Sequence, residues 1–331
     1  MPAADQRPIL VGVAQSTWRD IDFERTPVDV LADVAQKAID DSSITTLSRA
    51  IDAIVNIRFI ADTNPGAGAL FPRNPGAAIT ERLGLQDPAL YLGAIGGNTP
   101  QYLVNRCAEK LMAGDHRMML LCGAELMATF FAALKQGGDI SGWAQGPADE
   151  PFQIGETRDG LSTQETQHGL YEPINTYPLF ENSLRHHLGH SRAQHNALIA
   201  QISARMSAVA ANNPHAWHQQ AMSAEQISTV ARRNRIIGYP YTRAMNAVLE
   251  VDMAAAVIMT TVGTARELGI PEEQWIYYRG GADVNDIWYL SERADLHSSP
   301  AIRLAWETVS KSAGMTLDDL SHFDIYSCFP S

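Results

Sequence analysis

The chain has 331 residues, 45% of them hydrophobic, with 25 Lys and Arg against 37 Asp and Glu and a formal charge of −12. This length and composition predict one large or two ordinary globular domains with a sizeable core. The acidic balance leaves no general basic surface for a phosphate backbone, so nucleic acid is not an expected partner.

The first residues lack the pattern of a secretory signal, and no apolar run is long enough to span a bilayer. The sequence therefore predicts a soluble cytoplasmic protein with no membrane span. The three cysteines, Cys107, Cys122 and Cys328, are odd in number and far apart, which fits reduced thiols better than disulfides. No structural zinc spacing is present, and no metal is predicted.

Short apolar runs alternate with helical patterns over the first 126 residues. Residues 9–14 are typical of a buried strand, and Thr26 with Pro27 begins a helix whose apolar residues share one face. The remaining predicted elements are strands over 50–60, 89–96 and 117–126 and helices over 74–84 and 99–114. This alternation indicates right-handed crossovers and a mostly parallel sheet covered on both faces.

From 128 to 245 the pattern changes to segments rich in Gly, Gln and His and to amphipathic helices, which indicates a large insertion. Strand patterns return at 252–261, 275–281 and 323–329. A capped helix followed by a strand occurs after Thr26 and again after Ser299, which indicates either two similar α/β halves or a chance similarity. The second half is short, so a longer gene product or a second polypeptide is expected to complete its sheet.

Four motifs occur in one order: "GNTPQYLVNRCAEKLMAGD", "CGAELMAT", "YPLFENSLRHHLG" and "DMAAAVIM". This order resembles that of the thiolases, especially the sterol-carrier-protein-type, thiolase-like branch related to acetyl-CoA acetyltransferases. The resemblance implies an α/β fold, a thiolase-like layered sandwich of two duplicated halves with an inserted loop domain. The second half would be incomplete in this chain.

The resemblance also implies a domain organisation. The N-terminal half would span 1–127 and 246–272, the loop domain 128–245, and the start of the C-terminal half 273–331. A homodimer built through the strand "ALYLGAIG" is implied as well, and a partner subunit is the other expected association.

In the thiolases a cysteine at the turn before a helix attacks the thioester, and the resemblance assigns that position to Gly97. Glycine cannot form an acyl-enzyme. Gly97 either leaves room for a ligand that binds without attack or provides a positive φ for the turn. Thr99 stands where the family has serine, and it is either a substitute nucleophile or, before Pro100, the N-cap of the helix.

Further positions of the ligand site follow from the same resemblance. Tyr326 replaces the residue that positions a water near the thioester oxygen, and its phenol can donate a hydrogen bond there. Cys328 approaches that site and has either a chemical role or a packing role, whereas Cys107 and Cys122 are expected in the core. Val248 aligns with the serine that contacts the pantetheine of coenzyme A.

The insertion holds a cluster of three arginines, Arg232, Arg233 and Arg235. In a thiolase loop domain, such residues would grip the adenosine phosphates of coenzyme A, because the guanidinium fork suits phosphate geometry. An exposed helix end with charged side chains is the alternative interpretation of the same cluster.

A second cluster, "LRHHLGHSRAQH", holds four histidines, His186, His187, His190 and His195. The i, i+4 spacing of His186 and His190 would put both rings on one helical face, where they could bind a metal ion. The alternative is a polar helix face in contact with solvent, and the absence of an adjacent carboxylate in the usual zinc order favours it.

The function favoured by the sequence is a protein of acyl-CoA and lipid metabolism that binds coenzyme A or an acyl-CoA as a ligand. No tightly bound cofactor is expected, and the covalent acyl-enzyme is excluded if Gly97 is the nucleophile position. The alternatives are an active acyltransferase that uses another nucleophile or a non-covalent route, and a non-catalytic structural subunit. Whether the chain is an enzyme therefore stays open at this stage.

Overall fold

The computed structural model describes residues 4–43, 47–147, 149–156, 158–326 and 328–331. Contacts within the chain divide it into two compact units. Unit 1 consists of Met1–Thr157 and Leu249–Gly280, and unit 2 of Arg158–Val248 and Gly281–Ser331. The domain boundaries expected near 127, 245 and 272 stay a prediction. Within the described ranges, no helix combines the length and apolarity needed to cross a bilayer.

Unit 1 contains a sheet of seven strands in the order β5-β3-β2-β4-β8-β1-β9. The strands are β1 (Pro8–Thr17), β2 (Ala53–Ile57), β3 (Ala89–Gly93), β4 (Met118–Leu126), β5 (Phe152–Ile154), β8 (Asp252–Thr261) and β9 (Ile276–Tyr277). The pairs β5–β3, β3–β2 and β2–β4 are parallel, whereas β4–β8, β8–β1 and β1–β9 are antiparallel. The expectation of a mostly parallel sheet was therefore wrong, because β8 runs against both of its neighbours.

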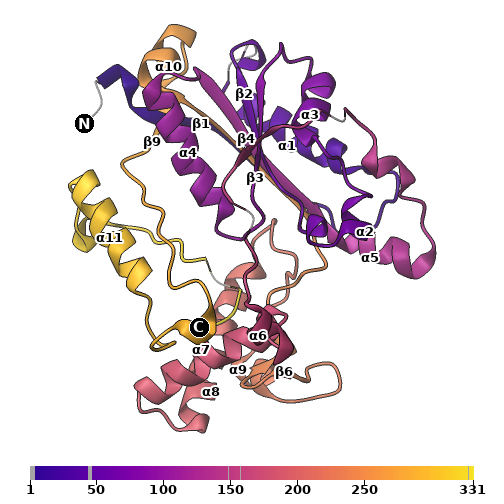
Figure 1. Ribbon diagram of the computed structural model, residues 1–331, viewed down its shortest axis with the longest axis vertical. Helices are drawn as coiled ribbons and strands as arrows, with labels where there is room; N and C mark the ends of the chain where they lie inside the picture. Colours follow the sequence, from indigo (N-terminus) through magenta and orange to yellow (C-terminus); the bar gives the residue numbers. More distant parts are fainter. Residues whose placement is uncertain (1–3, 44–46, 148, 157, 327) are drawn as a thin grey trace. The chain divides into compact units, whose positions relative to one another are not determined.

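Helices cover both faces of this sheet. They are α1 (Pro27–Asp41), α2 (Pro65–Gly68), α3 (Pro75–Leu83), α4 (Thr99–Ala113), α5 (Met127–Gln136) and α10 (Val262–Leu268). One buried apolar cluster joins α1, α3 and α5 to the sheet, and a second joins α4 to its other face. Figure 1 shows α4 on one side of the strands and α1 and α3 on the other.

Local capping explains where several of these helices begin and end. Thr26 caps α1 through a reciprocal pair of hydrogen bonds with Asp29, and Asn74 accepts the N–H of Ala77 at the start of α3. Gly84 and Gly114 end α3 and α4 in the left-handed conformation, which glycine adopts without steric cost. The predicted starts and ends of these helices are confirmed.

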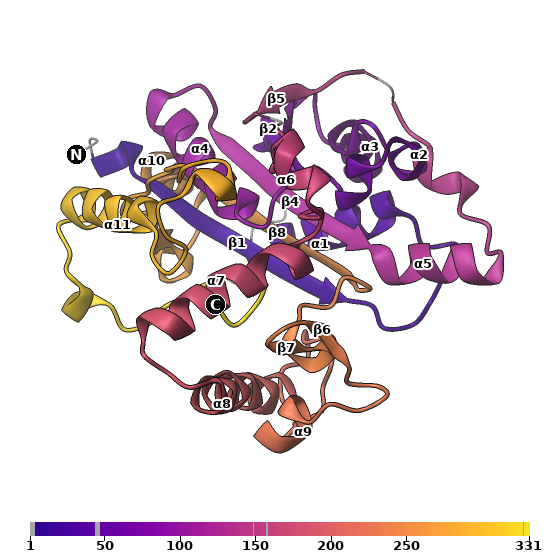
Figure 2. The same cartoon turned by 60° about the horizontal axis from the view of Figure 1, so that its bottom comes forward.

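Unit 2 is mainly helical, with one two-stranded hairpin. Its elements are α6 (Thr163–Gln167), α7 (Pro173–His187), α8 (Arg192–Ala210), α9 (Ala224–Ser228), β6 (Ile236–Gly238), β7 (Tyr241–Thr242) and α11 (Pro300–Ala313). Figure 2 shows α8 beside α9 and the β6–β7 hairpin. Its core contains Ile199, Tyr241 and Phe329, so the last residues of the chain pack against α8 and the hairpin.

Two of the strands expected late in the sequence differ from the structure. The strand expected over 275–281 is reduced to β9, which pairs with β1 over two residues. The strand expected over 323–329 is absent from the described part of that range, and Ser327 lies outside the described residues. The physical reason is pairing: a strand needs a neighbouring strand, and the hairpin of unit 2 pairs only within itself.

Candidate functional site

The turn between β3 and α4 carries Gly97 and Thr99. Gly97 is exposed, and it lies outside the left-handed region, since the glycines with positive φ are at other turns. The interpretation of Gly97 as a positive-φ residue is therefore wrong. Thr99 is 4% exposed and is the first residue of α4, whereas Asn98 is the N-cap and makes no side-chain capping bond. Because Asn98 is the N-cap residue and Thr99 is already in the helix, the expectation that Thr99 caps the helix is wrong.

Close packing explains two glycines near Gly97. A Cβ on Gly93 would lie 2.6 Å from Leu103 Cδ1, so glycine here lets α4 approach the end of β3. A Cβ on Gly96 would lie 2.9 Å from Asn98 Oδ1 and 3.0 Å from Thr99 Oγ1. The turn is therefore tight at Gly96, and the next residue, Gly97, is exposed.

The segment after β5 packs against the same turn. Ile154 accepts a hydrogen bond through its carbonyl from the N–H of Ala94 at 3.2 Å. A Cβ on Gly155, whose φ is +89°, would lie 3.3 Å from Tyr102 and 3.5 Å from Ala94. Along Tyr91–Gly93, β5 covers the edge of the strand that the resemblance assigned to a homodimer.

A buried carboxyl group lies at the carboxyl end of β4, the same end of the parallel strands as the turn after β3. Glu125 Oε1 accepts the N–H of Ile60 at 2.7 Å, while its Oε2 is buried and has no hydrogen-bond partner among the described residues. Burial raises the pKa of Glu125 to about 7; the Ile60 N–H lowers it and the nearby Asp62 carboxylate raises it. Sequence analysis missed this group, although it lies within the quoted motif "CGAELMAT".

The other two residues proposed for chemistry meet in unit 2. The Tyr326 hydroxyl and Cys328 Sγ are 2.8 Å apart, and the Cys328 carbonyl accepts the N–H of Ala247 at 3.2 Å. This bond brings Val248, the residue after Ala247, close to Cys328. Burial and the hydrogen bond with Cys328 raise the pKa of Tyr326.

The expected core positions of the other two thiols are confirmed. Cys107 and Cys122 are buried on the two faces of the unit 1 sheet, and burial raises the pKa of each thiol to about 12. Cys328 is only partly buried. It is therefore the most accessible of the three cysteines.

The arginine cluster lies at an exposed turn after α9. Arg232 and Arg233 form the two-residue loop of a bridge between Ala231 and Asn234. Arg235 follows this loop, and its carbonyl accepts the N–H of Arg243 at 2.9 Å. All three arginine side chains belong to exposed residues, which leaves their guanidinium groups accessible to an anion.

The histidine segment differs from both interpretations of it. α7 ends at His187, so His190 lies outside the helix and shares no helical face with His186. His195 is 1% exposed, and its Nε2 lies 2.5 Å from Oε1 of the equally buried Glu181. The description of His195 as part of a solvated face is therefore wrong. Across the described ranges, no group of three or more His, Cys, Asp or Glu side chains could hold a metal ion.

The Glu181–His195 pair was missed because the two residues are 14 positions apart on different helices. One signal could have indicated Glu181. It lies four residues after Tyr177 and three before Leu184, so a carboxylate occupies the apolar spacing of α7.

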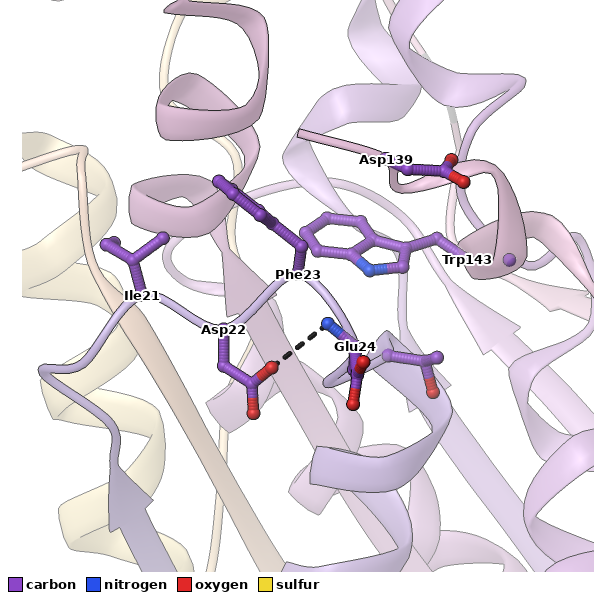
Figure 3. Close-up of a pocket in the computed structure, with 8 residues that line it drawn as sticks. Ile21, Asp22, Phe23, Glu24, Asp139 and Trp143 are labelled. Carbon is purple, nitrogen blue, oxygen red and sulfur yellow. Dashed lines mark hydrogen bonds between the residues drawn. The ribbon is translucent and has the colours of Figure 1, made fainter. Parts of the chain in front are cut away.

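A hollow of about 610 Å³ in unit 1 contains none of the residues predicted for the site. Its lining residues are Ile21, Asp22, Phe23, Glu24, Thr26, Asp139, Gly142 and Trp143. Figure 3 shows Asp22 and Glu24 on one side and Asp139 and Trp143 on the other, with Asp22 Oδ1 accepting the N–H of Glu24 at 3.0 Å. The hollow is acidic, which makes it unsuited to the phosphates of coenzyme A.

Comparison with known proteins gives a family likeness through solved structures. No protein-family model and no curated protein matches the chain. A monomeric SCP2-thiolase like protein type 1 from Mycobacterium smegmatis matches at a TM-score of 0.78 and 31% identity, over 99% of this chain and 62% of its own. The chain thus spans less than two thirds of the length of that relative.

Two further structures match at lower identity. The Ltp2–ChsH2(DUF35) aldolase has a TM-score of 0.66 and 15% identity, over 96% of this chain and 72% of its own. An acetyl-CoA acetyltransferase from Syntrophomonas wolfei has a TM-score of 0.60 and 15% identity, over 98% of this chain and 80% of its own. The coarse expectation is confirmed: by its structural neighbours, the chain has the thiolase-like α/β fold of the SCP2-thiolase-like proteins. The two duplicated halves and the inserted loop domain stay a prediction.

Proposed function

We propose that this protein binds a coenzyme A thioester in acyl-CoA and lipid metabolism without forming a covalent acyl-enzyme at position 97. The observation that carries this proposal is the exposed Gly97 at the turn before α4, in a fold shared with an acetyl-CoA acetyltransferase. Thr99 supports it further, because a hydroxyl on a residue that is 4% exposed is a poor nucleophile.

Each unit, taken by itself, offers polar groups to a ligand. Asn98 makes no side-chain cap, and the positive end of the α4 dipole would favour a thioester oxygen beside it. Of the backbone N–H groups there, that of Thr99 bonds to the Gly96 carbonyl and that of Tyr102 to the Asn98 carbonyl, so the dipole is the main attraction. Tyr326 would donate a hydrogen bond, and Cys328 and Val248 would line the same turn. Arg232, Arg233 and Arg235 would bind the phosphates of coenzyme A.

Calorimetric titration with acetyl-CoA, followed by intact-mass measurement, tests this function. We expect binding with no mass change. Reversing the charge at Arg232 and Arg233 to Glu should weaken binding about tenfold or more, because two phosphate contacts are lost. Arg303→Glu, on the exposed face of α11, is the matched control and should bind as the wild type does.

Two outcomes would contradict the proposal in different ways. Absence of binding at millimolar acetyl-CoA would show that acetyl-CoA is not a ligand of this protein. A stable acetyl adduct would instead favour the alternative, an active acyltransferase with a different nucleophile. Peptide mapping of the adduct would then identify the residue, with Cys328 the first position to examine.

A non-catalytic or partner-dependent subunit is the second candidate. One observation favours it: α11 has no buried residue and exposes Ile302 and Leu304, and Ile325 is 82% exposed. A partner subunit, a second copy or further polypeptide would cover these side chains. The aldolase relative carries two component names, Ltp2 and ChsH2(DUF35), which is compatible with a fold that works beside a partner. Light scattering of the purified chain, alone and with candidate partners, tests this.

A further inference from the structure

Glu125 lies on the α4 face of the unit 1 sheet, at the carboxyl end of β4. Side chains alternate between the two faces along a strand, and Met119 and Leu121 belong to the apolar cluster that packs under α4. β4 pairs with β8 without a register shift from Met118 to Leu126, so this alternation is unbroken. Glu125 therefore lies on the same face as Met119 and Leu121.

The turn before α4 lies at the same end of the strands. Gly93, the last residue of β3, pairs with Ile57 of β2, and a Cβ on Gly93 would lie 2.6 Å from Leu103 Cδ1 of α4. Towards β4, a Cβ on Gly123 would lie 3.0 Å from Ile57 Cδ1, and Glu125 follows Gly123 by two residues. β2 alone separates β3 from β4, so their axes are about 10 Å apart, a separation that an acyl thioester at the turn can bridge.

The sheet face next to Glu125 is partly uncovered. Glu125 pairs with Met253 of β8, and both residues are partly exposed. Two residues along β8 on the same face, Ala255 is exposed, and so is Gln15, which pairs with Ala255 from β1. A ligand can therefore approach this face at the end where α4 begins without displacing a side chain of the core.

The carboxyl group of Glu125 has spare capacity for a proton. Oε1 accepts only the Ile60 N–H, and Oε2 has no hydrogen-bond partner among the described residues, so each oxygen keeps a free lone pair. Burial raises the pKa of Glu125 to about 7, the Ile60 N–H lowers it and the Asp62 carboxylate raises it. The other charged group nearby is Arg58, whose Nη1 lies 3.9 Å from Asp62 Oδ2 and whose Nη2 donates to Gln153 Oε1 at 2.7 Å. A base with a pKa near neutrality both takes up and releases a proton readily.

We propose that Glu125 is a catalytic base that removes a proton from the carbon next to the thioester carbonyl of a bound acyl-CoA. This inference rests on the proposed function, since the thioester must bind at the turn before α4. The C–H bond breaks, the proton goes to the Glu125 carboxylate, and the electron pair forms a C–C double bond as the carbonyl π pair moves onto the thioester oxygen. The positive end of the α4 dipole stabilises the charge on that oxygen. Return of a proton from Glu125 to the same carbon restores the thioester.

Deuterium exchange into acetyl-CoA tests this step, and calorimetry on the same samples measures binding separately. In D2O, Glu125 returns a deuteron in place of the proton that it removed, so the acetyl methyl signal in the proton NMR spectrum decreases. At the same pH, we expect the wild type to exchange these protons about a hundredfold faster than buffer alone, because a positioned general base supplies at least that factor. The excess rate should rise with pH up to about pH 7 and then level, because the carboxylate is the reactive form.

One variant and a control complete the test. Glu125→Gln keeps an acceptor for the Ile60 N–H but takes up no proton, so it should bind acetyl-CoA as the wild type does and exchange at the rate of buffer. Glu81→Gln, at an exposed position on α3, should match the wild type in both measurements. A wild type that binds without exchange, or exchange that persists in Glu125→Gln, overturns the role of Glu125 and leaves thioester binding standing. A wild type that does not bind overturns both.

Discussion

Glu125 Oε1 accepts the backbone N–H of Ile60, and this single bond joins the end of β4 to the loop after β2. The second carboxyl oxygen has no hydrogen-bond partner among the described residues, and it is buried. Burial is the main reason that the pKa of Glu125 rises from its usual 4.5 to about 7. The folded protein therefore binds this proton more tightly than the unfolded chain does.

The sign of the resulting pH effect is fixed by that difference. Between about pH 4.5 and pH 7 the folded state holds more protons at this site, so the contribution of Glu125 to stability falls as pH rises. The Glu125→Gln variant keeps an acceptor for Ile60 and removes the titration. We expect it to be about 2 to 3 kcal/mol more stable than the wild type near pH 8 and nearly equal near pH 5.

Thermal unfolding at the two pH values measures this difference. Glu81→Gln on the exposed side of α3 is the control and should show no gain at either pH. A Glu125→Gln variant that gains nothing at high pH would mean that the carboxylate is adequately solvated in the folded protein.

Asp252 at the start of β8 caps the helix α5. Its Oδ1 accepts the N–H groups of Ala128 at 2.9 Å and Thr129 at 3.1 Å, and its Oδ2 accepts the Thr129 hydroxyl at 2.5 Å. Asp252→Ala would take away the partner of the Thr129 N–H and of the Thr129 hydroxyl, while the Ala128 N–H would keep the Val251 carbonyl at 3.3 Å. We expect a loss of about 2 to 4 kcal/mol and faster amide exchange over α5, with Asp252→Asn intermediate. Unchanged exchange in α5 would show that another group caps it.

The fold was predictable where the signals are local. Thr26 and Asn74 mark helix starts and Gly114 a helix end, because each acts through bonds or angles within a few residues. The direction of β8 was not predictable in this way. It depends on how the chain returns after residues 158–248, a long-range property that no short pattern encodes.

The site was predictable only in part, for the same physical reason. The Tyr326–Cys328 contact joins residues two positions apart, which a motif can place. The bond between His195 and Glu181 depends on how α8 packs on α7, and a histidine next to three others in the sequence resembles a polar surface. Motif order assigned the nucleophile position to Gly97, which stays a prediction, and the backbone angle of Gly97 depends on the surrounding turn.

β5 pairs along part of the outer edge of β3, so we expect the loss of β5 to change how the chain associates with other copies. Ile154→Pro removes the backbone N–H of residue 154 in β5, the residue whose carbonyl accepts the Ala94 N–H. We therefore expect β5 to detach from β3. An uncovered strand edge is a template for pairing with another chain. We expect the variant to show more dimer than the wild type in light scattering over a range of concentrations. Ile154→Val keeps the strand and should match the wild type; equal dimer content in all three would show that this edge does not limit association.

Gly97 lies at the N-terminal end of α4, where a helix lowers the pKa of a thiol. In the Gly97→Cys variant we expect the added thiol to be alkylated about tenfold faster near neutral pH than the one in Ala113→Cys, at the exposed C-terminal end of the same helix. Acetyl-CoA should then give an adduct in Gly97→Cys alone, located by peptide mapping. Since one variant places its cysteine just before α4 and the other at the last residue of α4, the comparison isolates the effect of the helix end. Equal alkylation rates would mean that this turn does not activate a thiol. Unequal rates without an adduct would mean that the thioester does not reach this turn.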